Sequence, residues 1–111
     1  MEISEREANG VSTFHVEGRV DTEGSVDLDL ALQAAVADGK HKLILDLAGV
    51  SYISSAGLRI LADILTQNKA NGGDLKLASV SRKVLRVLQI IGFTNFFNLY
   101  DTVEQAQSAF E

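Results

Sequence analysis

Two adjacent serines, Ser54 and Ser55, are the residues of this chain whose type and position best suit a chemical modification. They follow an apolar segment, residues 42–47, and a short polar segment, and they precede a helical pattern that begins at Ala56. A serine in this place can simply cap the helix, because its side chain accepts a hydrogen bond from an unpaired backbone N–H group. It can also accept a phosphate, since the helix dipole and the free N–H groups tolerate a new anion. The pair by itself is a weak functional signal, and both interpretations stay open.

A phosphate at this position would change the surface of the protein more than its interior. Phosphorylation adds a charge of about −1.5 to −2. Because a helix start accommodates an anion, we expect the domain to stay folded when it is modified. The expected consequence is a change in what this surface can bind.

The sequence contains none of the motifs of a common enzyme or metal site. Neither of its two histidines is spaced from another possible metal ligand as a known motif requires. His15 is more simply a residue on a strand face, and His41 a surface residue before a strand. Ser55, Ala56 and Gly57 lack the first glycine of a nucleophile elbow. No phosphate-binding Gly-x-x-x-x-Gly-Lys-Ser/Thr stretch is present. We therefore predict a protein that is not an enzyme and that uses no metal or cofactor.

Length and composition predict one compact domain over residues 1–111. The chain has no cysteine, so neither a disulfide nor a thiolate metal site holds it together. It shows no signal-peptide pattern, and no apolar run approaches the roughly 20 residues that span a bilayer. The net charge of −5 argues against nucleic acid as a partner and favours a partner with a basic patch. We expect a cytoplasmic protein without membrane insertion.

Hydrophobic periodicity predicts an α/β fold with the order β-β-α-β-α-β-α-β-α. Asn9 and Gly10 predict an N-terminal β-hairpin, because both residues tolerate a positive φ. Further strands are expected at residues 11–17, 42–47, 75–78 and 96–100, and helices at residues 25–38, 56–70, 82–91 and 102–110. Strands and helices alternate after the hairpin, which predicts right-handed crossovers and a mixed, mostly parallel sheet with about four helices.

Several local details follow from the same pattern. Ser25 is expected to cap the first helix, and Asp101 with Glu104 to form a capping box for the last one. Residues 48–53 are expected to form a polar turn, so that residues 51–55 leave the central strand at its carboxyl end, where functional loops of parallel sheets lie. Five apolar residues of the third helix are expected to face inward: Val84, Leu85, Val87, Leu88 and Ile91.

The central segment resembles a known family signature. Residues 45–47, Leu-Asp-Leu, and residues 50–58, Val-Ser-Tyr-Ile-Ser-Ser-Ala-Gly-Leu, resemble the signature of STAS domains, in particular the stand-alone anti-sigma-factor antagonists of bacteria. The likeness extends over nearly the whole chain, through Gly-Arg-Val-Asp at 18–21, Gly-Gly-x-Leu-x-Leu at 72–77 and a late helix that ends at Gly92-Phe93. The ordered set is specific for the fold, and it implies one STAS domain over residues 1–111.

The resemblance implies which residues carry the function. The family's phosphoacceptor serine typically follows an aspartate, and this chain has Ser55 at the serine position and Ser54 at the aspartate position. Ser54 is therefore a rival site. Arg59 replaces a glycine that is common in the family, and it could steady a phosphate or contact a partner, although a solvated helix face is its simpler role. The expected partner-binding residues are Asp21, Ser54, Ser55, Ala56, Gly57, Leu58 and Arg59. Asp46, inside an apolar strand, is expected to make a buried structural hydrogen bond.

The resemblance also implies a partner-switching mechanism. The unphosphorylated protein would bind an anti-sigma factor that is also a serine kinase of the histidine-kinase-like ATPase group. That kinase would phosphorylate Ser55 and release the protein, and a serine phosphatase would reset it. One alternative is a STAS-type accessory subunit of a transporter or other complex, which needs no phosphorylation cycle. Another is a small-molecule-binding or enzymatic module that uses the same sheet edge.

Overall fold

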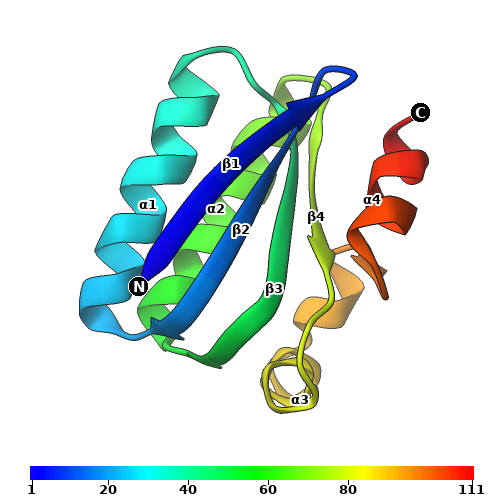
Figure 1. Cartoon of the computed structure of the whole chain (residues 1–111). Coiled ribbons are helices and arrows are strands. Elements are labelled where there is room, and N and C mark those ends of the chain that lie inside the picture. Colours follow the sequence, from blue (N-terminus) through cyan, green and yellow to red (C-terminus); the bar gives the residue numbers. More distant parts are fainter.

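The computed structural model describes residues 1–111 and contains a five-stranded mixed sheet with four α-helices (Figure 1). The strands follow one another in the order β1-β2-β3-β4-β5. Strands β1 (Glu2–Ala8) and β2 (Val11–Val20) form the antiparallel N-terminal hairpin. Strands β3 (Lys42–Ile53), β4 (Asp74–Ala78) and β5 (Leu99–Tyr100) continue the sheet in parallel. The predicted fold class and element order are confirmed.

The helices cover the sheet on both faces. Helices α1 (Thr22–Ala37) and α2 (Ser55–Ala70) pack side by side, and α3 (Arg82–Ile90) and α4 (Val103–Phe110) follow, with a short 3₁₀ turn η1 (Phe93–Asn95) between them. Leu43, Leu45 and Leu47 of β3 join the main core cluster, whereas Ile44 joins a smaller cluster under Ala106 of α4. Successive strand residues point to opposite faces, so both faces of β3 are covered. The sequence predicted this, because its aliphatic residues are nearly continuous.

Strand β3 is longer than predicted, because its partner β2 is also longer. Residues 48–53, expected as a polar turn, extend the strand instead. Val50 pairs with Gly18, Tyr52 with Arg19, and Ile53 with Val20 in the parallel register of β2 and β3. The register shifts twice on the way, which is how the polar stretch stays in the ladder while Val50 and Ile53 remain buried. The connection to α2 is therefore reduced to Ser54.

Helix α1 begins three residues earlier than the predicted cap at Ser25. Asp21 caps it, with Oδ1 accepting a hydrogen bond from the N–H of Gly24 at 2.8 Å. Ser25 lies inside the helix, where its hydroxyl donates to the carbonyl of Thr22 at 2.7 Å. Gly24 lies within the helix, and a Cβ there would lie 2.5 Å from the carbonyl oxygen of Arg19. This glycine permits a close approach of two backbones.

The C-terminal elements also differ from the prediction. The last strand, expected at residues 96–100, is confined to β5, and Phe97 before it is buried in the core. Thr102 caps α4 by accepting from the N–H of Gln105 at 3.1 Å, and the Gln105 side chain accepts from the N–H of Asp101 at 3.1 Å. The predicted partnership of Asp101 with Glu104 was therefore wrong by one residue at each position.

Helix α3 packs against the sheet along a narrower stripe than predicted. Val84 and Leu88 are buried, whereas Val87 and Ile91, expected to face inward, are exposed. The helix lies against β3 and η1 without a second helix over it, so one face of it stays in contact with solvent.

None of the four α-helices has both the length and the apolar character required to cross a lipid bilayer.

Candidate functional site

Ser54 is the N-cap of α2, and both its hydroxyl and its backbone N–H are hydrogen-bonded. Its backbone is extended, with φ −81° and ψ 166°, and its Oγ accepts from the N–H of Gly57 at 3.1 Å. Its own N–H donates to the carbonyl of Val20 at 2.7 Å. The half-buried hydroxyl of Ser54 thus serves the helix, as the capping interpretation predicts for one member of the pair.

Ser55 is the first residue of α2, and its side chain is exposed. Its hydroxyl makes no hydrogen bond within the protein, whereas that of Ser54 does. The N–H groups of the first helical turn lack intrahelical partners, and the positive end of the helix dipole lies there. A hydroxyl in this setting is accessible to another protein's active site, and a phosphate on it would sit in a favourable field.

The starts of α1 and α2 lie next to each other at the carboxyl ends of β2 and β3 (Figure 1). The hydrogen bond from Ser54 to Val20 joins the two strand ends, and Asp21 follows Val20 directly. Asp21 is exposed, and its Oδ1 is used as the α1 cap. The structure therefore brings Asp21, predicted from a distant part of the sequence, to the same edge of the sheet as the two serines.

The other predicted contact residues divide into an exposed and a buried group. Ala56 and Arg59 are exposed, and Arg59 lies four residues after Ser55, which places both on one face of α2. Gly57 and Leu58 are buried. A Cβ at Gly57 would lie 2.7 Å from Val20 Cγ1 and 3.0 Å from Ile53 Cγ1. The space beside Gly57 is therefore filled by the protein's own core and is not open to a partner.

Sequence reasoning missed a pair beside this site, Arg19 and Tyr52. These residues face each other across β2 and β3, and the Arg19 guanidinium lies 4.4 Å from the centre of the Tyr52 ring. Both are exposed. Tyrosine and arginine are enriched at protein–protein interfaces, where they act as anchors. The pair could have been predicted if residues 48–53 had been recognised as strand, because the extended strand β3 places Tyr52 opposite Arg19.

Comparison with known proteins identifies the fold family. The sequence model of the STAS domain matches residues 2–106. The chain belongs to the STAS domain family. This STAS domain is 31% identical over 111 residues to BtrV of Bordetella bronchiseptica, a candidate anti-sigma factor antagonist by name, covering all of this chain and 96% of BtrV. It is 32% identical to the anti-sigma-F factor antagonist RsfB of Mycobacterium tuberculosis, over 88% of this chain and 80% of RsfB.

The fold matches that of an anti-sigma factor antagonist with a known structure. Unphosphorylated SpoIIAA superposes with a TM-score of 0.85 at 17% identity, over 97% of this STAS domain and 95% of SpoIIAA. The phosphorylated form of SpoIIAA, from Bacillus, superposes with a TM-score of 0.78 at 16% identity, over 99% and 100% of the two chains. At these identities the comparison shows a shared fold, and it shows that the fold exists in both states of SpoIIAA.

Asp46 of this STAS domain makes structural hydrogen bonds, but it is partly buried and not fully buried as expected, and the sequence did not suggest one of its partners. Its Oδ1 accepts from the N–H of Ala48 at 3.1 Å, and its Oδ2 lies 2.7 Å from Nδ1 of His15. His15 and Asp46 are direct neighbours in the register of β2 and β3. The pair borders a cavity of about 590 Å³ beneath α4, whose floor includes Thr13. No cluster of three or more His, Cys, Asp or Glu side chains suited to a metal ion is present.

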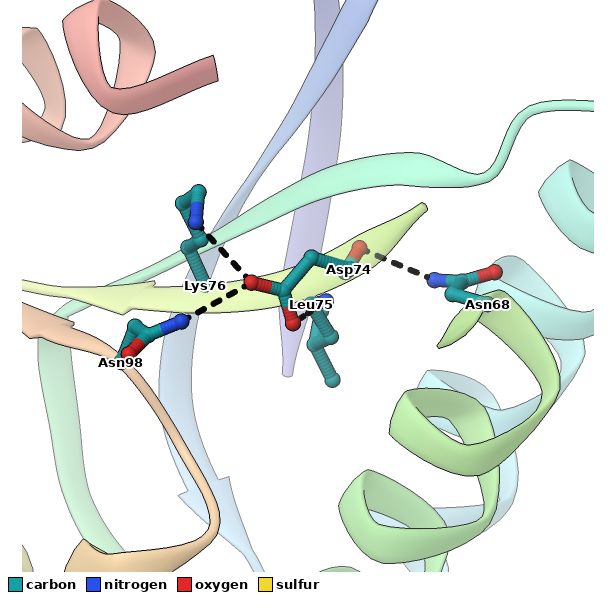
Figure 2. Close-up of polar contacts among 5 residues, drawn as sticks. All are labelled: Asn68, Asp74, Leu75, Lys76 and Asn98. Atoms are coloured by element: carbon teal, nitrogen blue, oxygen red, sulfur yellow. Dashed lines mark hydrogen bonds and ion pairs between the residues drawn. The ribbon is translucent and has the colours of Figure 1, made fainter. Parts of the chain in front are cut away.

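A second polar cluster lies at the start of β4, where Asp74 and Lys76 are buried (Figure 2). The Asp74 carboxylate accepts from Lys76 Nζ at 2.9 Å, from Asn98 Nδ2 at 3.0 Å and from the Leu75 N–H at 2.9 Å. Burial alone would raise the pKa of Asp74, but these three donors outweigh it and hold the pKa below its usual value. Asn68 reaches from α2 to the Asp74 carbonyl at 3.3 Å. No sequence motif points to these residues.

Proposed function

We propose that this STAS domain is an anti-sigma factor antagonist and that phosphorylation of Ser55 controls its binding. The single observation that carries the proposal is the exposed Ser55 hydroxyl at the first position of α2, at the sheet edge where functional surfaces of such folds lie. The names of BtrV and RsfB support the role, and the phosphorylated form of SpoIIAA supports the type of modification.

Ser55, and not Ser54, is the proposed phosphoacceptor. A kinase needs a hydroxyl that can enter its active site, and Ser55 is exposed, whereas the Ser54 hydroxyl is half-buried and bonded to the N–H of Gly57. Phosphorylating Ser54 would disturb the cap of α2, because the bulky phosphate would have to replace that bond. Phosphorylating Ser55 leaves the cap in place.

A phosphate on Ser55 changes the proposed docking surface in two ways. It adds a charge of about −1.5 to −2 next to the exposed carboxylate Asp21, and it adds bulk at a contact that small side chains such as Ala56 keep flat. A loss of about 1–3 kcal/mol of binding free energy corresponds to roughly 5–150-fold weaker binding. Arg59, one helical turn after Ser55 on the same face, is placed to neutralise part of that charge within the chain.

The proposed partner is an anti-sigma factor that is also a serine kinase of the histidine-kinase-like ATPase group. The unphosphorylated domain binds it through the half-buried Ser54 and the exposed residues of the edge, which are Asp21, Ser55, Ala56 and Arg59 together with Arg19 and Tyr52. A serine phosphatase returns the protein to its binding state, and the cycle takes place in the cytoplasm. The domain acts as a ligand and a substrate in this cycle and performs no catalysis of its own.

The test is a binding measurement on three variants, each against the same purified kinase. Ser55→Ala should keep the affinity of the parent and abolish modification by kinase and ATP, as read by intact mass. Ser55→Glu should fold as the parent does and bind roughly 5–150-fold more weakly. Ser108→Glu, which adds the same charge at an exposed serine of α4, is the matched control and should bind like the parent. Equal binding of Ser55→Glu and parent would refute the switch and favour a constitutive accessory role.

A further inference from the structure

The outer face of α3 is apolar and basic, and no other element covers it. Arg82, Lys83 and Arg86 occupy its first half and Ile90, 74% exposed, its end. Four further exposed residues on or next to α3 are Val87, Gln89, Ile91 and Phe96. None of the three cations makes an ion pair within the chain, since the ion pairs present involve His15, Lys40 and Lys76. Three of the ten Lys and Arg residues of a protein with net charge −5 thus lie on one nine-residue helix.

The cations of α3 lie at the wrong end for the stability of the helix itself. The N-terminus of a helix is the positive end of its dipole, and a cation there is unfavourable. Arg82 and Lys83 nevertheless occupy the first two positions of α3, and its last turn has no basic residue. Arg82 and Lys83 therefore oppose the helix dipole, and no ion pair within the chain compensates for them. Residues that cost stability without such compensation indicate a contact with another molecule.

The outer face of α1 has the complementary character. Val26 is 56% exposed and Leu30 67% exposed, and Glu23 and Asp27 flank them. Neither carboxylate makes an ion pair within the chain. Helix α1 lies along the left of the view in Figure 1 and α3 lies apart from it at the bottom, so the outer faces of the two helices do not meet within one copy.

We propose that α3 of one copy docks on α1 of a second copy, with the two helices parallel. In that orientation Glu23 lies opposite Lys83, Asp27 opposite Arg86, and Leu30 opposite Ile90. The matching stripes both extend over seven residues, or about 10 Å of helix. The antiparallel orientation would keep Asp27 opposite Arg86 but would place Glu23 against Ile90 and Lys83 against Leu30. The parallel orientation forms both ion pairs and the apolar contact, so complementary charge favours it.

The contact joins unlike surfaces and is small. A heterologous interface continues into an open chain of copies unless its rotation closes a ring. A few apolar side chains and two ion pairs correspond to the low end of interface sizes, below about 1,200 Å², so the association is weak and depends on concentration. The contact between α1 and α3 involves neither Ser54 nor Ser55. A test of this contact is therefore independent of the proposed phosphorylation switch.

The experiment is sedimentation velocity on the full chain from about 10 µM to about 1 mM, a range suited to weak association. The parent should sediment faster as the concentration rises. Arg86→Glu and Asp27→Arg should each remain monomeric, because each brings like charges together. An equimolar mixture of the two variants should associate again, since the new Glu on α3 meets the new Arg on α1, and the remaining wild-type faces meet each other.

Two control variants separate this contact from a general effect of charge. Lys69→Glu and Asp63→Arg make the same changes of charge at exposed positions of α2 and should associate like the parent. Circular dichroism checks that every variant is folded. A parent that is monomeric over the whole range would overturn the proposal, and so would a mixture that behaves like its separate components or controls that dissociate as the α1 and α3 variants do.

Discussion

The two ends of the sheet hold polar clusters of opposite kinds. At the start of β4, Asp74 and Lys76 are about nine-tenths buried and bonded to each other and to Asn98. At the end of β3, Ser54 uses its hydroxyl for the helix, and Ser55 leaves its hydroxyl exposed. The first cluster satisfies its polar atoms inside the protein, and the second leaves one available to a partner.

This difference separates what stabilises the fold from what can be modified. A buried charge without its partner is costly, so removing one member of the Asp74–Lys76 pair lowers the stability of the fold. A change at an exposed hydroxyl costs the fold little, because water replaces whatever the side chain loses. A residue that is phosphorylated and dephosphorylated repeatedly therefore belongs at an exposed position such as that of Ser55. Four predictions test this contrast between the buried and the exposed cluster.

The largest expected effect is that of Asp74→Ala on stability. The change leaves the Lys76 ammonium buried, with the rings of Phe110 at 4.6 Å and Tyr100 at 5.5 Å as its remaining favourable neighbours. Removing one partner of a buried ion pair costs about 3–5 kcal/mol of the free energy of unfolding. Urea denaturation measures the loss. The double variant Asp74→Leu with Lys76→Met should recover most of it, and no recovery would show that the ion pair is not the cause.

The second prediction concerns the acid dependence of the same cluster. The pKa of Asp74 is lower in the folded protein than in the unfolded chain, where it is about 3.9. The ionised carboxylate therefore contributes stability above about pH 4, and this contribution is lost as the pH falls through the folded-state pKa. Asp74→Asn should lose less stability than the parent when the pH falls below about 4, as measured by urea denaturation at each pH. Parallel curves would contradict the assignment.

The third prediction concerns the glycine next to the phosphoacceptor. Gly57→Ala favours the helix by about 1 kcal/mol, but its new methyl group meets Val20 and Ile53 at 3.0 Å or less. Overpacking of a core costs about 1–3 kcal/mol, so we expect a net loss of stability of about 1 kcal/mol. Ala56→Gly, at the exposed neighbour, is the comparison for backbone effects alone. A Gly57→Ala variant more stable than the parent would mean that α2 can move away from the sheet at low cost.

The smallest expected effect separates the two serines. Ser54→Ala removes the cap of α2 and should cost about 1 kcal/mol of the free energy of unfolding. Ser55→Ala removes no hydrogen bond and should change stability by less than about 0.5 kcal/mol. Thermal or urea denaturation of the two variants under the same conditions measures the difference. Equal losses would indicate that Ser55 also takes part in the cap.

Periodicity predicted the elements well and their ends less well. The stripe of Leu58, Leu61 and Leu65 predicted α2 correctly, because a helix that covers a sheet must be apolar at that spacing. The end of β3 was missed because Ser51 and Tyr52 read as a turn by composition. Strand pairing with β2, a property of two segments more than 30 residues apart, overrode that local signal.

The sequence by itself determined the order of the elements, the family resemblance and the two serines at a helix start, because each depends on residue types at short spacings. The tertiary structure decided which serine caps α2 and which is exposed. It also decided that residue 57 has no room for a side chain beside Val20 and Ile53, and that Asp74 binds Lys76 and Asn98. It also placed an acidic face on α1 and a basic face on α3 on separate parts of the surface. Burial and hydrogen bonding depend on which distant segments meet, and no local pattern of residues records that.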